Sequence, residues 1–377
     1  MTRILFLAAD IDLSRNRGDT LHARNLARAL VRVGNEVHMV VGASPSAEPI
    51  DGVNVSVRPD RGDARIVRFL LRKVRDVRPD IIYERRFSPK LASALSVLTG
   101  LPFAVEINGI PGMEAAMQGR PGPSGLSARV RRTAHTRFLR SAASIVAVTP
   151  GLRNALVTAY GVDPSRAFVV PNGVDAEMFR PEDRTAARRD LSLSDGKIVC
   201  FVGNLVRWQG LDLFMAAMEQ TPGSLSAVLV GDGPDHARLV ELARSRGLGH
   251  RVRFMGEVPY STVPRYLAAA DACVAPFTAE RNLPLGVSAL KVLEYLASAR
   301  PIVVTAIPGA RDLVDELGCG LVVPPEDPAA LGEAMVEVVS NEAFAGAALR
   351  ASEIVRERYS WDRTAQMVTD ILRRSLN

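Results

Sequence analysis

The strongest candidates for chemistry lie in one short stretch, NLPLGVSALKVLEYLASARPIVVT, at residues 282–305. Lys291 and Glu294 stand three residues apart in a helix that we expect to begin at Ser288 as its N-cap, so the two side chains share one helix face. A lysine in a first helical turn is disfavoured by the helix dipole, and a bound phosphate would offset that cost. A carboxylate among apolar residues needs a partner. Glu294 is therefore expected to pair either with Lys291 or with two hydroxyl groups of a ligand.

Two glycine turns follow strand-like runs in the same half of the chain. Gly203-Asn204 closes one run, and Gly231-Asp232-Gly233 closes the next. Glycine lets the backbone approach a ligand, and the N-terminus of a following helix attracts anions such as a pyrophosphate. The second turn lacks the third glycine of a dinucleotide fingerprint, and each turn alone is also consistent with a plain tight turn. The chain contains no Walker lysine motif, which excludes the P-loop NTPases.

A parallel α/β architecture must position these residues, because short apolar runs alternate with helix-period segments along most of the chain. The pattern restarts after about residue 180, and residues 172–181 form a hinge. We expect two doubly wound domains, 1–175 and 176–358, that face a ligand-binding cleft at the carboxyl ends of their strands, followed by an amphipathic helix within 359–377. The expected strands span 4–9, 36–41, 54–57, 80–83, 103–107, 144–148 and 168–170, and then 198–202, 227–230, 252–255, 272–275, 302–305 and 321–323.

Composition is consistent with two globular domains in a reducing compartment. The chain has 377 residues, 47% of them hydrophobic and 23% charged. Cys200, Cys273 and Cys319 lie far apart without metal-ligand spacing, so neither disulfides nor zinc are expected. The longest uncharged stretch, 91–105, is too short to span a bilayer, and Arg3 leads directly into the first strand without a signal peptide. A cytoplasmic location follows as an expectation.

The net charge of +6 is unevenly distributed. Up to Asp175 there are 25 basic and 15 acidic residues, and after it 22 and 26. Basic helices of this kind can lie on anionic lipid or bind an acidic acceptor, although a solvated arginine face is the alternative. Nucleic acid is not an expected partner, because no recognised fold or aromatic platform accompanies the charge. One basic helix carries Arg61, Arg65, Arg68, Arg72 and Arg75 opposite Ile66, Leu70, Val74 and Val77, and a second carries Arg129, Arg131, Arg132, Arg137 and Arg140.

The whole chain resembles the glycosyltransferases of family 4, which are retaining enzymes of the GT-B fold that use nucleotide sugars. The resemblance implies two Rossmann-like domains, with the acceptor bound by the first, the donor by the second, and a C-terminal helix that packs back on the first. It implies no cofactor and leaves the oligomeric state open. The matching segments occur in the family's order: VVPNGVD at 169–175, then 201–210, 228–234, 252–259 and 288–304, and YSW at 359–361.

The resemblance assigns roles to the candidates of the second domain. Glu294 matches the second glutamate of the family's E-x7-E signature, whose carboxylate accepts hydrogen bonds from ribose hydroxyls. The first glutamate, which contacts the donor sugar, falls at Gly286 and is missing here, and Glu280 is acidic but wrongly spaced. The family's phosphate-binding arginine and lysine align with Asn204 and Gln209, so both cations are replaced, but the two positions are still expected to line the donor site.

We therefore expect Arg207 and Lys291 to neutralise the leaving diphosphate as catalytic residues. Backbone N–H groups at Leu290 and Lys291 and the turn at Gly233 would assist them. Asp10-Ile11-Asp12 spells DxD, the metal signature of a different glycosyltransferase fold, but it ends the first strand here. We expect no metal, because cations and helix N-termini already supply the charge that Mg²⁺ would bring.

In the first domain, the loop at residues 14–20 resembles the family's glycine loop after the first strand, whose backbone touches the donor phosphate. Gly18 is the expected contact. Asp19 and His22 are acceptor-side candidates, and a surface position on a helix is the alternative for His22. Asn108 occupies the position where many relatives carry a histidine near the reacting sugar, so a histidine base is not expected. Asn108, as a catalytic candidate, and Glu106 are expected to hydrogen-bond sugar hydroxyls or else to form a structural turn.

The predicted reaction is a retaining transfer from a nucleoside-diphosphate sugar to a hydroxyl acceptor. Since no carboxylate is placed as a nucleophile, a front-face route is favoured, in which the departing phosphate helps to deprotonate the acceptor. The acceptor is unknown, with an anionic or membrane-associated molecule favoured by the basic first domain, and peripheral association with the inner face of the membrane follows as an expectation. The alternatives are a nucleotide-sugar epimerase or hydrolase and a non-catalytic binding protein.

Overall fold

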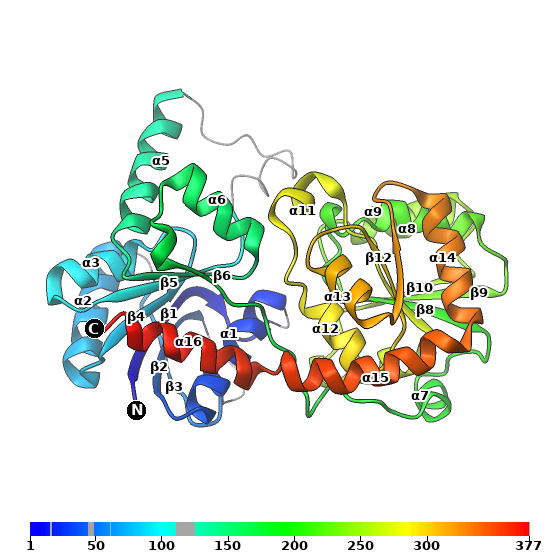
Figure 1. Cartoon of the computed structure of the whole chain (residues 1–377), viewed down its shortest axis with the longest axis horizontal. Helices are drawn as coiled ribbons and strands as arrows, with labels where there is room; N and C mark the ends of the chain where they lie inside the picture. The colour runs from blue at the N-terminus through cyan, green and yellow to red at the C-terminus, as the bar shows by residue number, and fades with distance from the viewer. Residues whose placement is uncertain (16, 44–48, 61, 111–124, 377) are drawn as a thin grey trace. The chain divides into compact units, whose positions relative to one another are not determined.

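A computed structural model describes residues 1–15, 17–43, 49–60, 62–110 and 125–376 of the chain. The chain divides into two compact units, shown in Figure 1. Unit 1 comprises Met1–Asn172 and Trp361–Asn377, and unit 2 comprises Gly173–Ser360. Unit 2 is therefore continuous in sequence, whereas unit 1 is assembled from two separate segments.

Unit 1 is built on a seven-stranded sheet in which neighbouring strands are parallel, in the order β3-β2-β1-β4-β5-β6-β7. Its central strands are almost continuously apolar because helices cover both faces of such a sheet. In β1, for example, the side chains from Ile4 to Ala8 are fully buried. The strands are β1 (Arg3–Asp12), β2 (Glu36–Ala43), β3 (Asn54–Val57), β4 (Ile81–Arg85), β5 (Phe103–Ile107), β6 (Ser144–Ala147) and β7 (Ala167–Val169).

The helices of unit 1 begin and end at residues that suit helix termini. Thr149 caps α6 by accepting a 3.1 Å hydrogen bond from Leu152 N, with Pro150 at the first helical position. Gly100 and Gly161 end α3 and α6 in the left-handed conformation. The helices are α1 (Gly18–Arg32), α2 (Asp63–Val77), α3 (Lys90–Thr99), α5 (Gly125–Arg140), α6 (Pro150–Tyr160), the 3-10 helix η1 (Pro164–Arg166) and α16 (Trp361–Arg374).

The last helix, α16, packs beside α1, as Figure 1 shows. Its apolar face is buried, as the sequence pattern predicted, through Trp361, Ala365, Val368, Ile371 and Leu372. A buried hydrogen bond of 2.8 Å from Asn35 Nδ2 to Thr369 Oγ1 fixes α16 against the end of α1. The chain thus returns to unit 1 after completing unit 2.

Unit 2 repeats the same architecture with a six-stranded parallel sheet, in the order β10-β9-β8-β11-β12-β13. Its strands are β8 (Lys197–Val202), β9 (Leu225–Val230), β10 (Val252–Gly256), β11 (Ala272–Ala275), β12 (Ile302–Thr305) and β13 (Gly320–Val323). Its helices are α7 (Arg184–Asp190), α8 (Leu211–Gln220), α9 (His236–Ser245), α10 (Val263–Ala269), α11 (Ala279–Leu285), α12 (Leu290–Ala297), α13 (Ala310–Leu317), α14 (Pro328–Ser340) and α15 (Glu342–Arg358), with the 3-10 helices η2 (Arg207–Gln209) and η3 (Tyr260–Thr262).

The predicted architecture of two doubly wound α/β domains is confirmed. Each strand expected from the sequence is present, with ends that differ by up to three residues. The largest difference is in β1, which continues to Asp12 because this residue still pairs with Ala43 of β2 beyond the apolar run. Within the described ranges, no helix has the length and apolarity needed to cross a bilayer.

Candidate functional site

In unit 2, the two glycine turns interlock at the carboxyl ends of β8 and β9. Gly203 and Gly231 have positive φ angles of 147° and 126°, a backbone conformation that favours glycine. A Cβ on Gly231 would collide with the carbonyl of Gly203, and a Cβ on Gly203 would lie 2.5 Å from Lys291 Nζ. A Cβ on Gly233 would lie 2.6 Å from Asn204 Oδ1. The structure therefore brings Lys291, from the start of α12, against the turn that ends β8.

The amine of Lys291 is buried among neutral partners. Its Nζ donates a 2.8 Å hydrogen bond to Gln209 Oε1 and lies 3.7 Å from the centre of the Phe201 ring. The residue is 9% exposed, and burial lowers the pKa of Lys291 to about 7, although nearby Glu294 acts to raise it. One pKa unit corresponds to about 1.36 kcal/mol. An attraction to the ring of about 0.5–2 kcal/mol therefore offsets only part of the cost of burial.

Gln209 occupies the position at which the family's lysine was expected. Lys291 Nζ lies within hydrogen-bonding distance of the Gln209 side chain, so a lysine amine stands beside position 209 although it comes from α12 and not from η2.

Glu294 accepts its hydrogen bond from a tyrosine and forms no ion pair with Lys291 within the described ranges. Tyr260 OH donates to Glu294 Oε1 at 2.7 Å. The carboxylate is 6% exposed, and burial raises its pKa to about 7 against the opposing effects of Tyr260 and Lys291. The interpretation of Lys291 as its partner is therefore wrong. Tyr260 was not a sequence candidate, although it directly follows the family segment at 252–259.

Helix α12 begins at Leu290, one residue later than an N-cap at Ser288 implies. Its N-cap is Ala289, without a side-chain hydrogen bond, so the prediction of Ser288 as N-cap is wrong. The preceding loop is held elsewhere, because Val287 N donates a 2.9 Å hydrogen bond to Pro308 O. Residues Leu290 and Lys291 occupy the first turn, where backbone N–H groups have no acceptor within the helix.

Gly286, where the family's first glutamate is missing, has a backbone that favours glycine. Its φ of 69° and ψ of 178° lie in a region that is essentially restricted to glycine. A Cβ there would also approach Pro308 O to 3.2 Å. The absence of the glutamate therefore has a local physical reason.

Arg207 and Asn204 lie at the exposed rim of the same turns. Arg207 begins η2, two residues before Gln209, and it forms no ion pair with any described carboxylate. Gly210 must follow η2, because a Cβ at this position would collide with Pro276 O. The guanidinium of Arg207 is thus open to an anion from solvent.

Unit 1 contains a buried polar cluster around Glu106 of β5. Asn108 Nδ2 donates to Glu106 Oε1 at 2.6 Å, and Tyr83 OH donates to Oε2 at 2.8 Å. Nε2 of His22 lies 2.7 Å from Oε1, and Nε of Arg85 lies 3.3 Å from it. Burial acts to raise the pKa of Glu106, but His22, Arg85 and Asn108 outweigh it and hold this pKa at about 2.

His22 is 3% exposed, so the interpretation of a surface histidine is wrong. Its ring meets the edge of Trp361 at a centroid distance of 5.1 Å, so the first residue of α16 helps to enclose the cluster. Asn108 is partly exposed and connects the cluster to the surface. Tyr83, Arg85 and Trp361 were missed as members, and the only sequence signal for the first two is their place at the end of β4.

Within the described residues, no side-chain hydrogen bond or ion pair joins Gly18 or Asp19 to the cluster around Glu106. Gly18 is the first residue of α1, and a Cβ on it would meet nothing within 4 Å. Asp19 is exposed, and its Oδ1 accepts a 3.0 Å hydrogen bond from Thr20 N. Of the loop at 14–20, Asn16 lies outside the described residues.

The two aspartates of the DxD sequence at the end of β1 interact with neighbouring protein groups. Asp12 Oδ1 accepts hydrogen bonds from Ser14 N at 3.0 Å and from Ser14 Oγ at 2.6 Å. Asp10 lies 3.8 Å from Arg86 Nε. Across the part of the chain that the structure describes, no group of three or more His, Cys, Asp or Glu side chains is arranged to hold a metal ion.

Two family models match the chain, one in each half. Residues 17–178 match the model described as Glycosyltransferase Family 4, and residues 196–341 match the model described as Glycosyl transferases group 1. A D-inositol 3-phosphate glycosyltransferase of Nocardioides sp. is 32% identical over 259 residues, which cover 63% of this chain and 55% of that relative. The chain thus spans about half the length of this curated relative.

Two solved structures share the whole fold. A sucrose-phosphate synthase from Thermosynechococcus elongatus superposes with a TM-score of 0.81 at 20% identity and covers 99% of both chains. Anabaena Alr3699/HepE, in complex with UDP-glucose, superposes with a TM-score of 0.80 at 20% identity and covers 99% of this chain and 100% of its own. At this level of identity these similarities show the fold.

Proposed function

We propose that this chain, which belongs to glycosyltransferase family 4, transfers a sugar with retention of configuration from a nucleoside-diphosphate sugar to a hydroxyl acceptor. The observation that carries the proposal is the convergence of Lys291, Glu294 and the glycine turns at one edge of the unit 2 sheet. An amine that can carry positive charge and backbone N–H groups can bind a diphosphate, and a buried carboxylate can accept hydrogen bonds from a ribose.

In this proposal the donor binds to unit 2. Glu294 accepts hydrogen bonds from ribose hydroxyls, while the amine of Lys291 and the amides of the first turn of α12 bind the diphosphate. Arg207, exposed at the rim, approaches the same phosphates from η2. These groups stabilise the negative charge that develops on the leaving diphosphate, so we propose that the step needs no metal ion.

The bond between the anomeric carbon and the diphosphate oxygen breaks, and the acceptor oxygen bonds to the same face of that carbon. The acceptor's proton passes to the departing phosphate oxygen, so no protein nucleophile is required. On the acceptor side, Glu106 fixes the amide of Asn108 through its Nδ2 group. The Asn108 Oδ1 atom is then oriented to accept a hydrogen bond from a sugar or acceptor hydroxyl.

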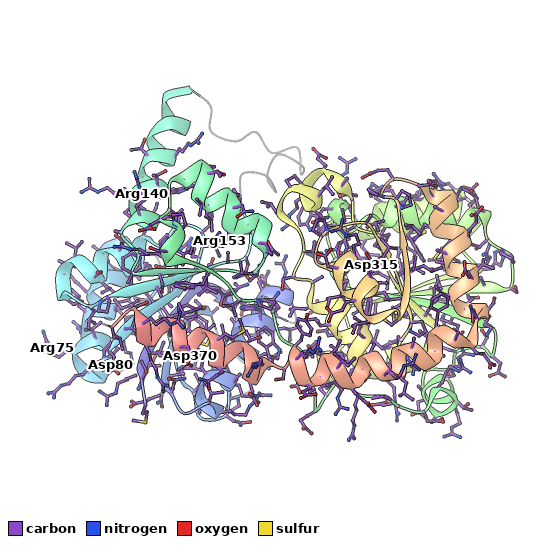
Figure 2. The ribbon with its side chains drawn as sticks, viewed as in Figure 1. Arg75, Asp80, Arg140, Arg153, Asp315 and Asp370 are labelled. Atoms are coloured by element: carbon purple, nitrogen blue, oxygen red, sulfur yellow. The ribbon has the colours of Figure 1, made fainter. Side chains whose placement is uncertain are left out.

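We further propose that the acceptor is an anionic molecule at a membrane surface, which the basic helix α2 would contact. Arg65, Arg68, Arg72 and Arg75 are exposed along α2, and none of them pairs with a described carboxylate. Figure 2 shows Arg75 at the outer edge of unit 1. Ile66 and Leu70 are buried on the opposite side of the helix, as the sequence pattern predicted. Of the expected basic positions, the side chains of Arg61, Arg129 and Arg131 lie outside the described residues.

Ligand binding followed by turnover tests the proposed activity. UDP is the first ligand to try, because a structure of the same fold is a complex with UDP-glucose. A ligand at 100 times its Kd stabilises the folded state by about 2.7 kcal/mol, which thermal shift detects. Transfer to an added acceptor, with little consumption of donor alone, supports a transferase. Donor consumption without acceptor would indicate an epimerase or hydrolase, and no stabilisation by any nucleoside diphosphate would contradict the proposal.

Sedimentation with vesicles tests the membrane part. We expect the chain to bind vesicles that contain anionic phosphatidylserine, with binding reduced when Arg65, Arg68, Arg72 and Arg75 are replaced by glutamine and when salt screens the charges. Glutamine substitutions at four exposed arginines of unit 2, Arg180, Arg189, Arg253 and Arg350, form the control. Equal binding to neutral vesicles, or none to anionic ones, would contradict the membrane surface and favour an acidic soluble acceptor.

A further inference from the structure

Among the residues that the structure describes, no carboxylate forms an ion pair with Lys291. Its amine contacts Gln209 from η2 and Phe201 from β8, and the Phe277 ring lies 5.9 Å away after β11. The titratable group that acts on it is Glu294 of its own helix, whose Oε1 is bound by Tyr260 of η3. Arg207, two residues before Gln209, is exposed to solvent.

We propose that Gln209 positions the Lys291 amine at the Gly203 turn as a neutral hydrogen-bond acceptor, and that this amine takes up a proton when the diphosphate of a donor binds beside it. The inference rests on the proposed function, because it requires a donor diphosphate at this turn. Gln209 is a positioning residue here, and Lys291 is the group that meets the phosphates.

A neutral residue at position 209 is favourable because the negative charge beside Lys291 should come from the donor and not from the protein. A glutamate at position 209 would form a permanent ion pair with the amine, and an incoming diphosphate would have to compete with that carboxylate. A neutral amide orients Nζ without adding a competing negative charge. The diphosphate then supplies the nearby negative charge that favours the ammonium form. The proton comes from solvent, and the bound state contains an ammonium ion beside the phosphates.

Burial supports this sequence of events. It lowers the pKa of Lys291 to about 7, so that at pH 8 most of the amines are neutral before the donor arrives. A phosphate at hydrogen-bonding distance opposes this lowering, so we expect donor binding to raise the pKa of the amine. The expected uptake at pH 8 is therefore more than about half a proton per donor bound.

Isothermal titration calorimetry at pH 8 measures this uptake. UDP-glucose is the probe, because each of its phosphates is a diester with no second ionisation near that pH. The apparent binding enthalpy is measured in two buffers with different ionisation enthalpies, and its slope gives the number of protons taken up. Wild-type protein is expected to take up more than about half a proton, and Lys291→Met almost none, with weaker binding. Lys197→Met is the matched control, because Lys197 is the other lysine of unit 2 and is exposed at the start of β8.

The Gln209→Glu variant separates positioning from mere packing. Its carboxylate charges the amine in advance, so we expect uptake to fall below about 0.2 proton and affinity for UDP-glucose to fall at least tenfold. Gln209→Ala is expected to keep the uptake but to bind more weakly, because Nζ loses its hydrogen bond. Binding by wild type without proton uptake, or undiminished uptake in Gln209→Glu, would overturn the inference and leave the proposed function standing. Failure of wild type to bind either UDP-glucose or UDP would contradict both.

Discussion

The hydroxyl of Tyr260 donates a 2.7 Å hydrogen bond to Oε1 of Glu294 and so ties η3 to α12. Among the residues that the structure describes, Oε2 of the same carboxylate has no donor. Tyr260 thus orients one oxygen of Glu294 and leaves the other available to the ribose hydroxyl that we propose binds there. Because burial raises the pKa of Glu294 to about 7, a hydrogen bond to the charged form also helps to keep this carboxylate ionised.

Replacing Glu294 by alanine is expected to weaken UDP binding by about 10- to 150-fold. Hydrogen bonds to a charged group contribute about 1.5–3 kcal/mol each, and the ribose would lose its acceptor. Calorimetric titration of UDP measures the change. Tyr260→Phe serves as the comparison, with a smaller loss, because it keeps the carboxylate and removes only its orienting donor. Unchanged affinity in Glu294→Ala would mean that Glu294 serves only to anchor Tyr260.

Replacing Lys291 or Arg207 by alanine is expected to lower turnover by about 10²–10³-fold each. Removal of one preorganised donor to a developing oxyanion costs about 2.7–4 kcal/mol. The measurement is kcat in a transfer assay at saturating donor, with Lys197→Ala as the control variant. Near-normal turnover in both single variants would contradict the assignment of these two cations to the leaving diphosphate.

Restoring the family's first glutamate through Gly286→Glu is expected to destabilise the chain without improving transfer. The backbone at this position has φ of 69° and ψ of 178°, and strain of this kind costs about 1–3 kcal/mol. Urea denaturation measures the loss. Gly223→Glu is the matched control, because Gly223 has a φ outside the glycine-favouring region and nothing within 4 Å of an added Cβ. A Gly286→Glu variant that is as stable as wild type and more active would refute this explanation.

The cluster around Glu106 predicts a defined acid dependence of stability. The pKa of this carboxyl in the folded chain is about 2, below its ordinary value of 4.5, so its ionised form stabilises the fold above about pH 4.5. That contribution is lost as pH falls from about 4.5 towards 2, where protons bind more readily to the unfolded chain. Unfolding in urea at several pH values between 3 and 6 should show a steeper loss for wild type than for Glu106→Gln.

Tyr83→Phe provides a second variant for the same cluster. It removes one hydrogen bond to the charged Glu106 and leaves an aromatic ring of similar volume, so a loss of about 1.5–3 kcal/mol in the free energy of unfolding is expected at pH 7.

For the Glu106→Gln comparison, parallel stability curves of wild type and variant across the acid range would contradict the role given to the Glu106 carboxylate.

The sequence was sufficient to predict the fold because the signals that define it are local. Buried parallel strands are continuous apolar runs, and glycine turns such as Gly231-Asp232-Gly233 mark their ends. Strand ends were less accurate where pairing continues into polar residues, as it does at Asp12 of β1. The resemblance to a known family added the expected role of Glu294 and the departures from the family at Gln209 and Gly286, which periodicity alone does not indicate.

The partners within the site could not be predicted in the same way, because they come from distant segments. Helical spacing offered Lys291 as one alternative partner of Glu294, but the residue that donates to Glu294 is Tyr260, 34 residues away in the sequence. The neighbours of Glu106 depend on the pairing of β4 with β5, where Arg85 lies opposite Glu106. The burial of His22 depends on Trp361, which arrives from the far end of the chain.

The division of unit 1 into two segments has a consequence for synthesis. Unit 2 is continuous and leaves the ribosome as one complete stretch, whereas the helix that completes unit 1, with the buried Trp361 and Leu372, is made after all of it. Domains generally fold as units during synthesis, in the order in which they emerge. Here that order is reversed: the second unit can finish first, and the first must wait with the apolar contacts of α1 uncovered until the last helix is released.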